Sequence, residues 1–173
     1  MNIFHVDQDP IIAAQSLVDK HVIKMILESA QLMSTAHRVL DGVKVDKNYV
    51  LYDAREPILY KVTHINHPSA KWIRESVENY NWLVDHFFAL MTEYNFRYDK
   101  THKCYGELSY LLSSPPKNLK NFDWTTPPSC MNDQYIISNN PVVNYRNYYK
   151  FGKANLHNWK KRNPPEWLNE HSA

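Results

Sequence analysis

The stretch IIAAQSLVDKHVIKMILESAQLMSTAHRVL, residues 11–40, decides the fold of this chain. Apolar and small side chains recur along it at steps of three or four residues, and neither glycine nor proline interrupts it. Asp9-Pro10 in front of it is a typical helix start, with aspartate as the N-cap and proline in the first turn. We therefore predict one long helix that ends before Asp41-Gly42.

The rest of the chain repeats this pattern. Asn66-His67-Pro68 opens an apolar row that predicts a second long helix over about 68–95, and Asn140-Pro141 opens a third that runs to about Trp159. Three shorter features are expected: a strand or extended arm at 1–7, a short helix around 52–60 and another over 102–113, with a proline-bearing loop at 115–133. Because hairpin signals are absent, we predict an all-α fold, a compact bundle of three long helices plus short helices in a single helical domain, 1–173.

Composition excludes several classes of protein. With 3 glycines among 173 residues, the chain contains neither a dinucleotide-binding fingerprint nor a P-loop. Cys104 and Cys130 form no metal-type pair, which is typical of a reduced cytosolic protein. No segment is long and apolar enough to span a bilayer, and the N-terminus lacks a signal-peptide pattern. We expect a soluble cytoplasmic protein, in the host cytoplasm if it is phage-encoded, that needs no cofactor; its oligomeric state stays open.

Positive charge is concentrated near the C-terminus, although the formal net charge is only +2. Residues 134–165 contain no acid, and cations alternate there with aromatics. Such side chains can neutralise phosphates and stack on bases. The candidate nucleic-acid contacts are Arg146, Tyr148, Tyr149, Lys150 and Lys153. The alternative is an amphipathic helix that buries its tyrosines in the core.

Polar residues form a row along the first helix. Steps of three and four residues place on one face Lys20, His21, Lys24, Glu28, Gln31, Thr35 and Arg38. This row is either a solvated face or a site in which a carboxylate stabilises a developing positive charge or moves protons. In the second case Glu28 is the catalytic group, with His21, Lys24 and Arg38 around it.

Three histidines are further candidates for phosphate contacts. His64 and His67 lie at the entry of the second helix, whose free backbone N–H groups can seat a phosphate. Spacing provides no third ligand, so we predict no metal site. His102 lies between two lysines in YDKTHK, residues 98–103, and is either a phosphate contact or part of a helix-end cation cluster.

Taken in order, these motifs resemble the small all-α phage pyrimidine-dimer DNA glycosylases with AP-lyase activity, the endonuclease V type. Asp19-Lys20-His21 followed by Glu28 is similar to the family's Asp-Gln-His and catalytic glutamate. NHPSAKWIRESVENYNWLVDHFFALMTEYNFRY resembles the long middle helix of the family, and YYKFGKA, residues 148–154, resembles its C-terminal aromatic segment. The chain also resembles a widespread group of tailed-phage proteins.

The resemblance implies a mechanism. In the family, the N-terminal α-amine attacks C1′ of a damaged nucleotide, the base leaves, a Schiff base forms and β-elimination cuts the strand. Carried over, Met1 supplies the amine because Asn2 is too large for efficient removal of the initiator methionine, and Glu28 is the catalytic carboxylate. His21 would contact a phosphate, while Tyr148, Tyr149 and Lys153 would grip the distorted duplex. Two positions where the family has arginines correspond to Leu27 and Gln31.

The sequence thus predicts a DNA N-glycosylase, with or without AP-lyase activity, that acts on a damaged or modified base. Two alternatives stay open. One is a non-catalytic phage protein that binds DNA or a host factor, and the other is an enzyme that acts on a free modified nucleotide. The expected partner is accordingly DNA or a nucleotide.

Overall fold

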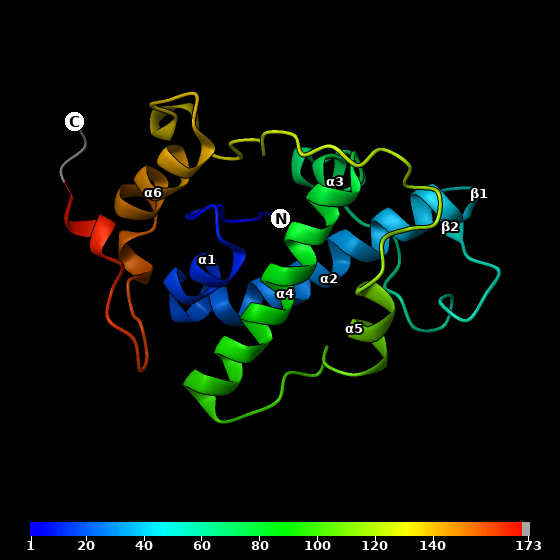
Figure 1. Ribbon diagram of the computed structural model, residues 1–173, viewed down its shortest axis with the longest axis horizontal. Coiled ribbons are helices and arrows are strands. Elements are labelled where there is room, and N and C mark those ends of the chain that lie inside the picture. Colours follow the sequence, from blue (N-terminus) through cyan, green and yellow to red (C-terminus); the bar gives the residue numbers. More distant parts are fainter. Residues whose placement is uncertain (171–173) are drawn as a thin grey trace.

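The computed structural model describes residues 1–170 and confirms the predicted all-α class (Figure 1). The α-helices are α1 (Pro10–Ser16), α2 (Asp19–Asp41), α3 (Pro68–Ile73), α4 (Val77–Tyr98), α5 (Glu107–Leu112) and α6 (Pro141–Gly152). Three short 3₁₀ helices follow in the second half of the chain: Asp133–Tyr135, Ala154–Leu156 and Glu166–Asn169. Helix α4 packs against α1 and α2, and Figure 1 shows it crossing over α2 at the centre of the molecule. This crossing forms most of the apolar core.

The predicted first helix is broken into α1 and α2 at Leu17 and Val18. The buried guanidinium of Arg97 on α4 accounts for the break, because it donates to the carbonyl oxygen of Leu17 at 2.8 Å and to that of Gln15 at 2.9 Å. The N–H of Val18 donates to the Tyr149 hydroxyl at 3.2 Å. Groups that a continuous helix would bond internally are therefore bonded by side chains distant in sequence.

The predicted second helix is also divided, into α3 and α4. Ser76 has extended dihedral angles, and its hydroxyl accepts a hydrogen bond from the N–H of Asn79, so it is an N-cap that starts a new helix. The Asn79 side chain donates to the Trp72 carbonyl of α3 at 2.9 Å and fixes the bend. The predicted boundary at 95 is extended to Tyr98, where Asp99 ends α4 in the left-handed conformation with φ 56°.

The structure differs from the sequence prediction in four smaller details. Residues 43–50 form a hairpin of β1 (Val43–Val45) and β2 (Asn48–Val50), whose Asp-Lys turn is not a strong hairpin signal. Residues 52–60 form turns instead of a helix, because Pro57 lies in the middle of this stretch and disfavours a helix there. The predicted third helix ends at Gly152, before a 3₁₀ turn, and the predicted helix over 102–113 is only α5.

The first six residues are an extended arm and not a strand. Ile3, Phe4, His5 and Val6 on this arm are all buried. The segment 117–140 runs from α5 along α3 and returns to α6 beside the arm (Figure 1). These two irregular segments bring the N-terminus to the middle of the molecule, where it meets α2.

Candidate active site

The N-terminal amine meets a carboxylate inside the fold. The Met1 nitrogen lies 3.3 Å from Oε1 of Glu28, a residue on α2 that is only 9% exposed. Asn2 fixes this end of the arm, because its amide donates to the Cys130 carbonyl oxygen at 2.9 Å and its Oδ1 accepts from the Tyr145 hydroxyl at 2.8 Å. Residues from the segment 117–140 and from α6 therefore hold the amine against α2.

Glu28 is only half satisfied by the protein. Its Oε1 pairs with the Met1 amine, but its Oε2 is buried and has no hydrogen-bond partner within residues 1–170. Buried polar atoms are nearly always bonded, since an unmet acceptor costs about 1–3 kcal/mol. A buried carboxylate oxygen left without a donor beside an amine is typical of a site that binds a ligand or transfers a proton.

His67 lies near this pair at the start of α3. Burial lowers the pKa of His67, the positive charges of the Met1 amine and of His64 lower it further, and the negative charge of Glu28 raises it. Its Nδ1 accepts from the N–H of Ser69 at 3.1 Å, so the neutral ring caps α3. The amine thus has a carboxylate and a neutral imidazole in its surroundings. His64 is exposed and bonds the Thr63 hydroxyl at 2.7 Å.

His21 is part of a second cluster next to the arm. Its ring stacks on Phe4 at 4.3 Å, and its Nδ1 lies 2.6 Å from the Tyr149 hydroxyl. Burial lowers its pKa to about 4, and the charges of Lys153 and Lys24 contribute. His21 is therefore neutral at pH 7, so in its predicted role as a phosphate contact it would act without a positive charge. The two lysines lie close enough to influence its pKa.

The free cations nearest this cluster come from two elements. Lys24 is exposed on α2, and the Lys153 ammonium lies 5.1 Å from the centre of the Tyr148 ring just after α6. Neither lysine has a carboxylate partner in the described part of the chain. Of the predicted contacts, Lys24, Tyr148 and Lys153 thus remain accessible beside His21.

Arg38 does not belong to the site. Its side chain is fully buried, pairs with the Glu56 carboxylate and donates to the carbonyl oxygens of Tyr49, Glu56, Leu59 and Tyr60. The guanidinium ties the hairpin and the following turns to α2, and it has no donor to spare for a phosphate. The interpretation of the polar row as a solvated face is also wrong, because Glu28, Thr35 and Arg38 are all buried.

Other predicted contacts are structural. Tyr149 is completely buried and bonds His21, so it cannot grip a duplex. Arg146 donates to the Val6 carbonyl oxygen at 2.7 Å and pairs with Asp7, and Lys150 donates to the carbonyl oxygen of residue 170. His102 follows the C-terminal end of α4. His67 precedes α3, which lies at the N-terminal end of α4, so the structure does not bring the two histidines together (Figure 1).

Acids from elsewhere in the chain neutralise much of the acid-free segment. Besides Arg146 with Asp7, Arg162 pairs with Glu93 at 2.9 Å, and Lys161 pairs with Asp99 at 2.9 Å. Three of the six cations in the segment are therefore paired with acids in space. Sequence reasoning also missed Asn2 and Tyr145, which position the amine through contacts that leave no local pattern.

Metal-binding clusters and membrane-spanning helices are both absent from the described residues. Within residues 1–170, no group of three or more His, Cys, Asp or Glu side chains is arranged to hold a metal ion. None of the helices in the same part of the chain has the length and apolarity needed to cross a membrane.

Comparison with known proteins gives a family match over the part of the chain that contains Met1 and Glu28. No curated protein and no solved structure matches the chain. A family described as pyrimidine dimer DNA glycosylase matches residues 1–106, which contain the arm, α1–α4 and the Met1–Glu28 pair. This match covers more than half of the 173 residues. The chain therefore belongs to the pyrimidine dimer DNA glycosylase family.

Proposed function

We propose that this protein is a DNA N-glycosylase with AP-lyase activity, with the Met1 α-amine as nucleophile and Glu28 as the group that exchanges protons with it. The observation that carries the proposal is the 3.3 Å contact between the Met1 nitrogen and Glu28 Oε1. Buried ion pairs are costly to assemble unless geometry and further bonds compensate. Here the second carboxylate oxygen has no donor among residues 1–170, so stability alone does not explain the pair.

The geometry supports nucleophilic attack by the amine. Transfer of a proton from the Met1 ammonium to Glu28 leaves a nitrogen lone pair that can attack C1′ of a deoxynucleotide. The C1′–base bond breaks, and the base leaves with the bonding electrons and takes up a proton. Nitrogen then loses a second proton, the C1′–O4′ bond opens and O4′ takes up a proton, which gives a protonated imine (an iminium) between Met1 and C1′. Glu28 can accept and return these protons.

Strand cleavage follows from the imine. Because the C1′=N bond withdraws electrons, a base can remove a proton from C2′, and the electron pair expels the phosphate on C3′. Water then hydrolyses the imine and regenerates the amine. The unpartnered Oε2 of Glu28 is the protein atom available to hold the opened sugar hydroxyl or take the C2′ proton. Because the ring of His67 is neutral, it does not repel the positive charge of the iminium.

The surroundings of the pair suit a nucleic-acid backbone. Lys24 and Lys153 lack carboxylate partners among residues 1–170 and can contact phosphates, and the Tyr148 ring beside Lys153 is available for stacking. A base attached to C1′ must leave the duplex stack for the amine to reach the sugar. The family description names pyrimidine dimers, so a thymine dimer is the first lesion to test.

The test uses three labelled duplexes: one with an abasic site, one with a thymine dimer and one undamaged. Each is incubated with protein and borohydride, which reduces an imine to a stable secondary amine. We expect cleavage and a trapped complex with the first two duplexes only. Glu28→Gln should lower both by about 100-fold or more, whereas Glu78→Gln, which removes the same charge from an exposed position on α4, should not. Unchanged cleavage by Glu28→Gln, or no trapping with any duplex, would overturn the proposal.

A further inference from the structure

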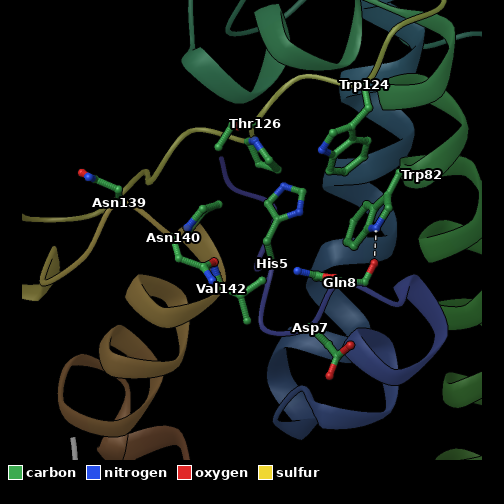
Figure 2. Close-up of a pocket in the computed structure, with 11 residues that line it drawn as sticks. His5, Asp7, Gln8, Trp82, Trp124, Thr126, Asn139, Asn140 and Val142 are labelled. Atoms are coloured by element: carbon green, nitrogen blue, oxygen red, sulfur yellow. Dashed lines mark hydrogen bonds between the residues drawn. The ribbon is translucent and has the colours of Figure 1, made fainter. Parts of the chain in front are cut away.

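A pocket of about 560 Å³ lies beside the N-terminal arm (Figure 2). Its walls come from the arm, from α4, from the segment 117–140 and from the start of α6. The volume falls in the range of pockets that hold small organic ligands. Trp124, Asn139 and Asn140 in its wall lie outside the family match, so this pocket combines the shared part of the chain with its own C-terminal part.

Aromatic rings form one side of the pocket. The rings of His5 and Trp82 are 4.5 Å apart, and Trp124 stands edge-on to Trp72 at 5.3 Å. The indole N–H of Trp82 donates to the Gln8 carbonyl oxygen at 2.8 Å, which fixes that ring. Trp124 is 45% exposed and so presents a large part of its ring to an incoming ligand. Such walls favour a flat ring that can stack.

His5 brings an unsatisfied polar atom into this aromatic wall. The residue is 2% exposed, and its Nε2 is buried without a hydrogen-bond partner in the described part of the chain. Figure 2 shows the His5 ring in the middle of the pocket residues, with Trp82 and Trp124 to one side and Asn140 and Val142 to the other. Burial and the charge of His86 hold the pKa of His5 well below its usual value, so the ring offers one donor and one acceptor.

The rim of the pocket is polar, and none of the described residues that line it is a lysine or an arginine. Thr126, Asn139 and Asn140 supply a hydroxyl and two amides, which offer both donors and acceptors. The charged residue among the lining residues is Asp7, which already pairs with Arg146 at 3.1 Å. A phosphate would find no positive charge on these walls. The lining therefore suits a neutral flat ring with hydrogen-bonding edges.

We propose that this pocket binds a nucleobase, stacked against Trp124 and Trp82 and bonded at its edge by His5 and the two asparagines. The base can belong to a free nucleoside or to a nucleotide turned out of a DNA strand. His5 is four residues from Met1, so the pocket lies within about 14 Å of the amine along the arm. The assignment concerns base binding and does not depend on Met1 acting as a nucleophile.

The experiment has two arms. In the first, each of the four deoxynucleosides is titrated into the protein by calorimetry. In the second, a single-stranded and a duplex oligonucleotide containing 2-aminopurine are titrated while the fluorescence of this base is followed, since stacking quenches it. Both arms use the wild type, Trp124→Ala, His5→Phe and Phe122→Ala. Phe122 is 65% exposed on the same segment and does not line the pocket, so its variant is the matched control.

We expect binding or quenching with the wild type and with Phe122→Ala, weakened about ten-fold by Trp124→Ala because base–aromatic stacking is lost. His5→Phe keeps the ring and should change the order of preference among bases. Binding in the nucleoside titration identifies a free nucleoside as the ligand, and quenching only in the oligonucleotide titration identifies a base within DNA. If Trp124→Ala and Phe122→Ala show the same affinity and the same quenching in both titrations, the proposal is wrong. This comparison holds whether or not His5→Phe folds.

Imine trapping on the same wild-type protein separates the two proposals. Trapping without base binding would overturn the nucleobase pocket alone. Base binding without trapping would overturn the lyase proposal alone.

Discussion

The Met1–Glu28 pair and the cationic segment 146–162 both concentrate charge, but the fold treats them in opposite ways. Half of the cations in the segment pair with acids from elsewhere in the chain, as Arg162 does with Glu93. Glu28 instead keeps one buried oxygen without a donor in the described residues. Charge that is fully paired holds elements together, and charge left unmet at a buried position is available to a substrate. From this difference we propose the pair, and not the more conspicuous segment, as the reactive centre.

Among the paired charges, we expect the largest loss of stability from a substitution of Arg97. Its buried guanidinium bonds Asp19 on α2 and Glu93 on α4. Arg97→Met keeps much of the apolar side-chain volume but leaves two buried carboxylates short of a partner, so we expect the free energy of unfolding to fall by about 3–5 kcal/mol. Urea denaturation measures it. Lys161→Met, which breaks an exposed pair with Asp99, should cost less than about 1 kcal/mol; equal losses would contradict this account.

Acid should weaken the core through its histidines. Burial lowers the pKa of His21, His37 and His86 to about 4, from about 6.5 in the unfolded chain. Below pH 6.5 the unfolded chain binds protons at these histidines and the folded chain does not. The free energy of unfolding is therefore highest above pH 6.5 and decreases as pH falls toward 4. Each histidine contributes up to about 1.4 kcal/mol per pH unit in this window. Unfolding curves from pH 7 to pH 4.5 test this.

A variant sharpens the pH experiment. His86→Phe removes a buried ring whose Nε2 has no partner within residues 1–170, and it keeps the stacking surface for Trp82. We expect a shallower loss of stability with acid than in the wild type. His64→Ala, at an exposed position, should leave the slope unchanged. A wild-type stability that does not change over this pH range would show that burial is not keeping these rings neutral.

DNA binding should distinguish unpaired from paired lysines. Lys153→Met removes a cation that lacks a carboxylate partner in the described chain, and Lys161→Met removes one paired with Asp99. We expect Lys153→Met to weaken binding several-fold and to lower the slope of log K against log salt by about one. Lys161→Met should change neither. Fluorescence anisotropy at several salt concentrations gives both quantities, and identical slopes for the two variants would refute the distinction.

The smallest expected effect is on His21. Burial is the main cause of its lowered pKa, and the charge of Lys153 is the next. In Lys153→Met the pKa of His21 should therefore rise but stay below 6.5. Titration of the ring by NMR measures this, with Lys161→Met as the control. An unchanged pKa would place Lys153 too far from His21 to influence it.

Local patterns predicted the helices but not their interruptions. The period over 11–40 is helical, yet the break at Leu17 depends on Arg97, which lies 80 residues further along the chain. The helical period places Arg38 on the same face as Glu28 and so predicts that it belongs to the site, but its partners come from turns that have no periodicity. A side chain's face follows from sequence, whereas what packs over that face does not.

The candidate site shows the same limit. Glu28 and Met1 enter as a pair only through the family resemblance, because no spacing rule joins the first residue to α2. Asn2 and Tyr145, which hold the amine in place, are 143 residues apart. His5 lies in an arm predicted as a strand or extended segment, and nothing in MNIFHVD indicates that its ring is buried in a pocket.

The measurement that tests the central claim most directly is the position of the adduct in a borohydride-trapped complex with abasic-site DNA. The trapped protein is digested with protease and nuclease, and the modified peptide is sequenced by mass spectrometry. This account predicts that the sugar remnant is on the α-nitrogen of Met1, 3.3 Å from Glu28 in the free protein. An adduct on the side chain of Lys24 or Lys153, with the Met1 amine unmodified, would contradict it.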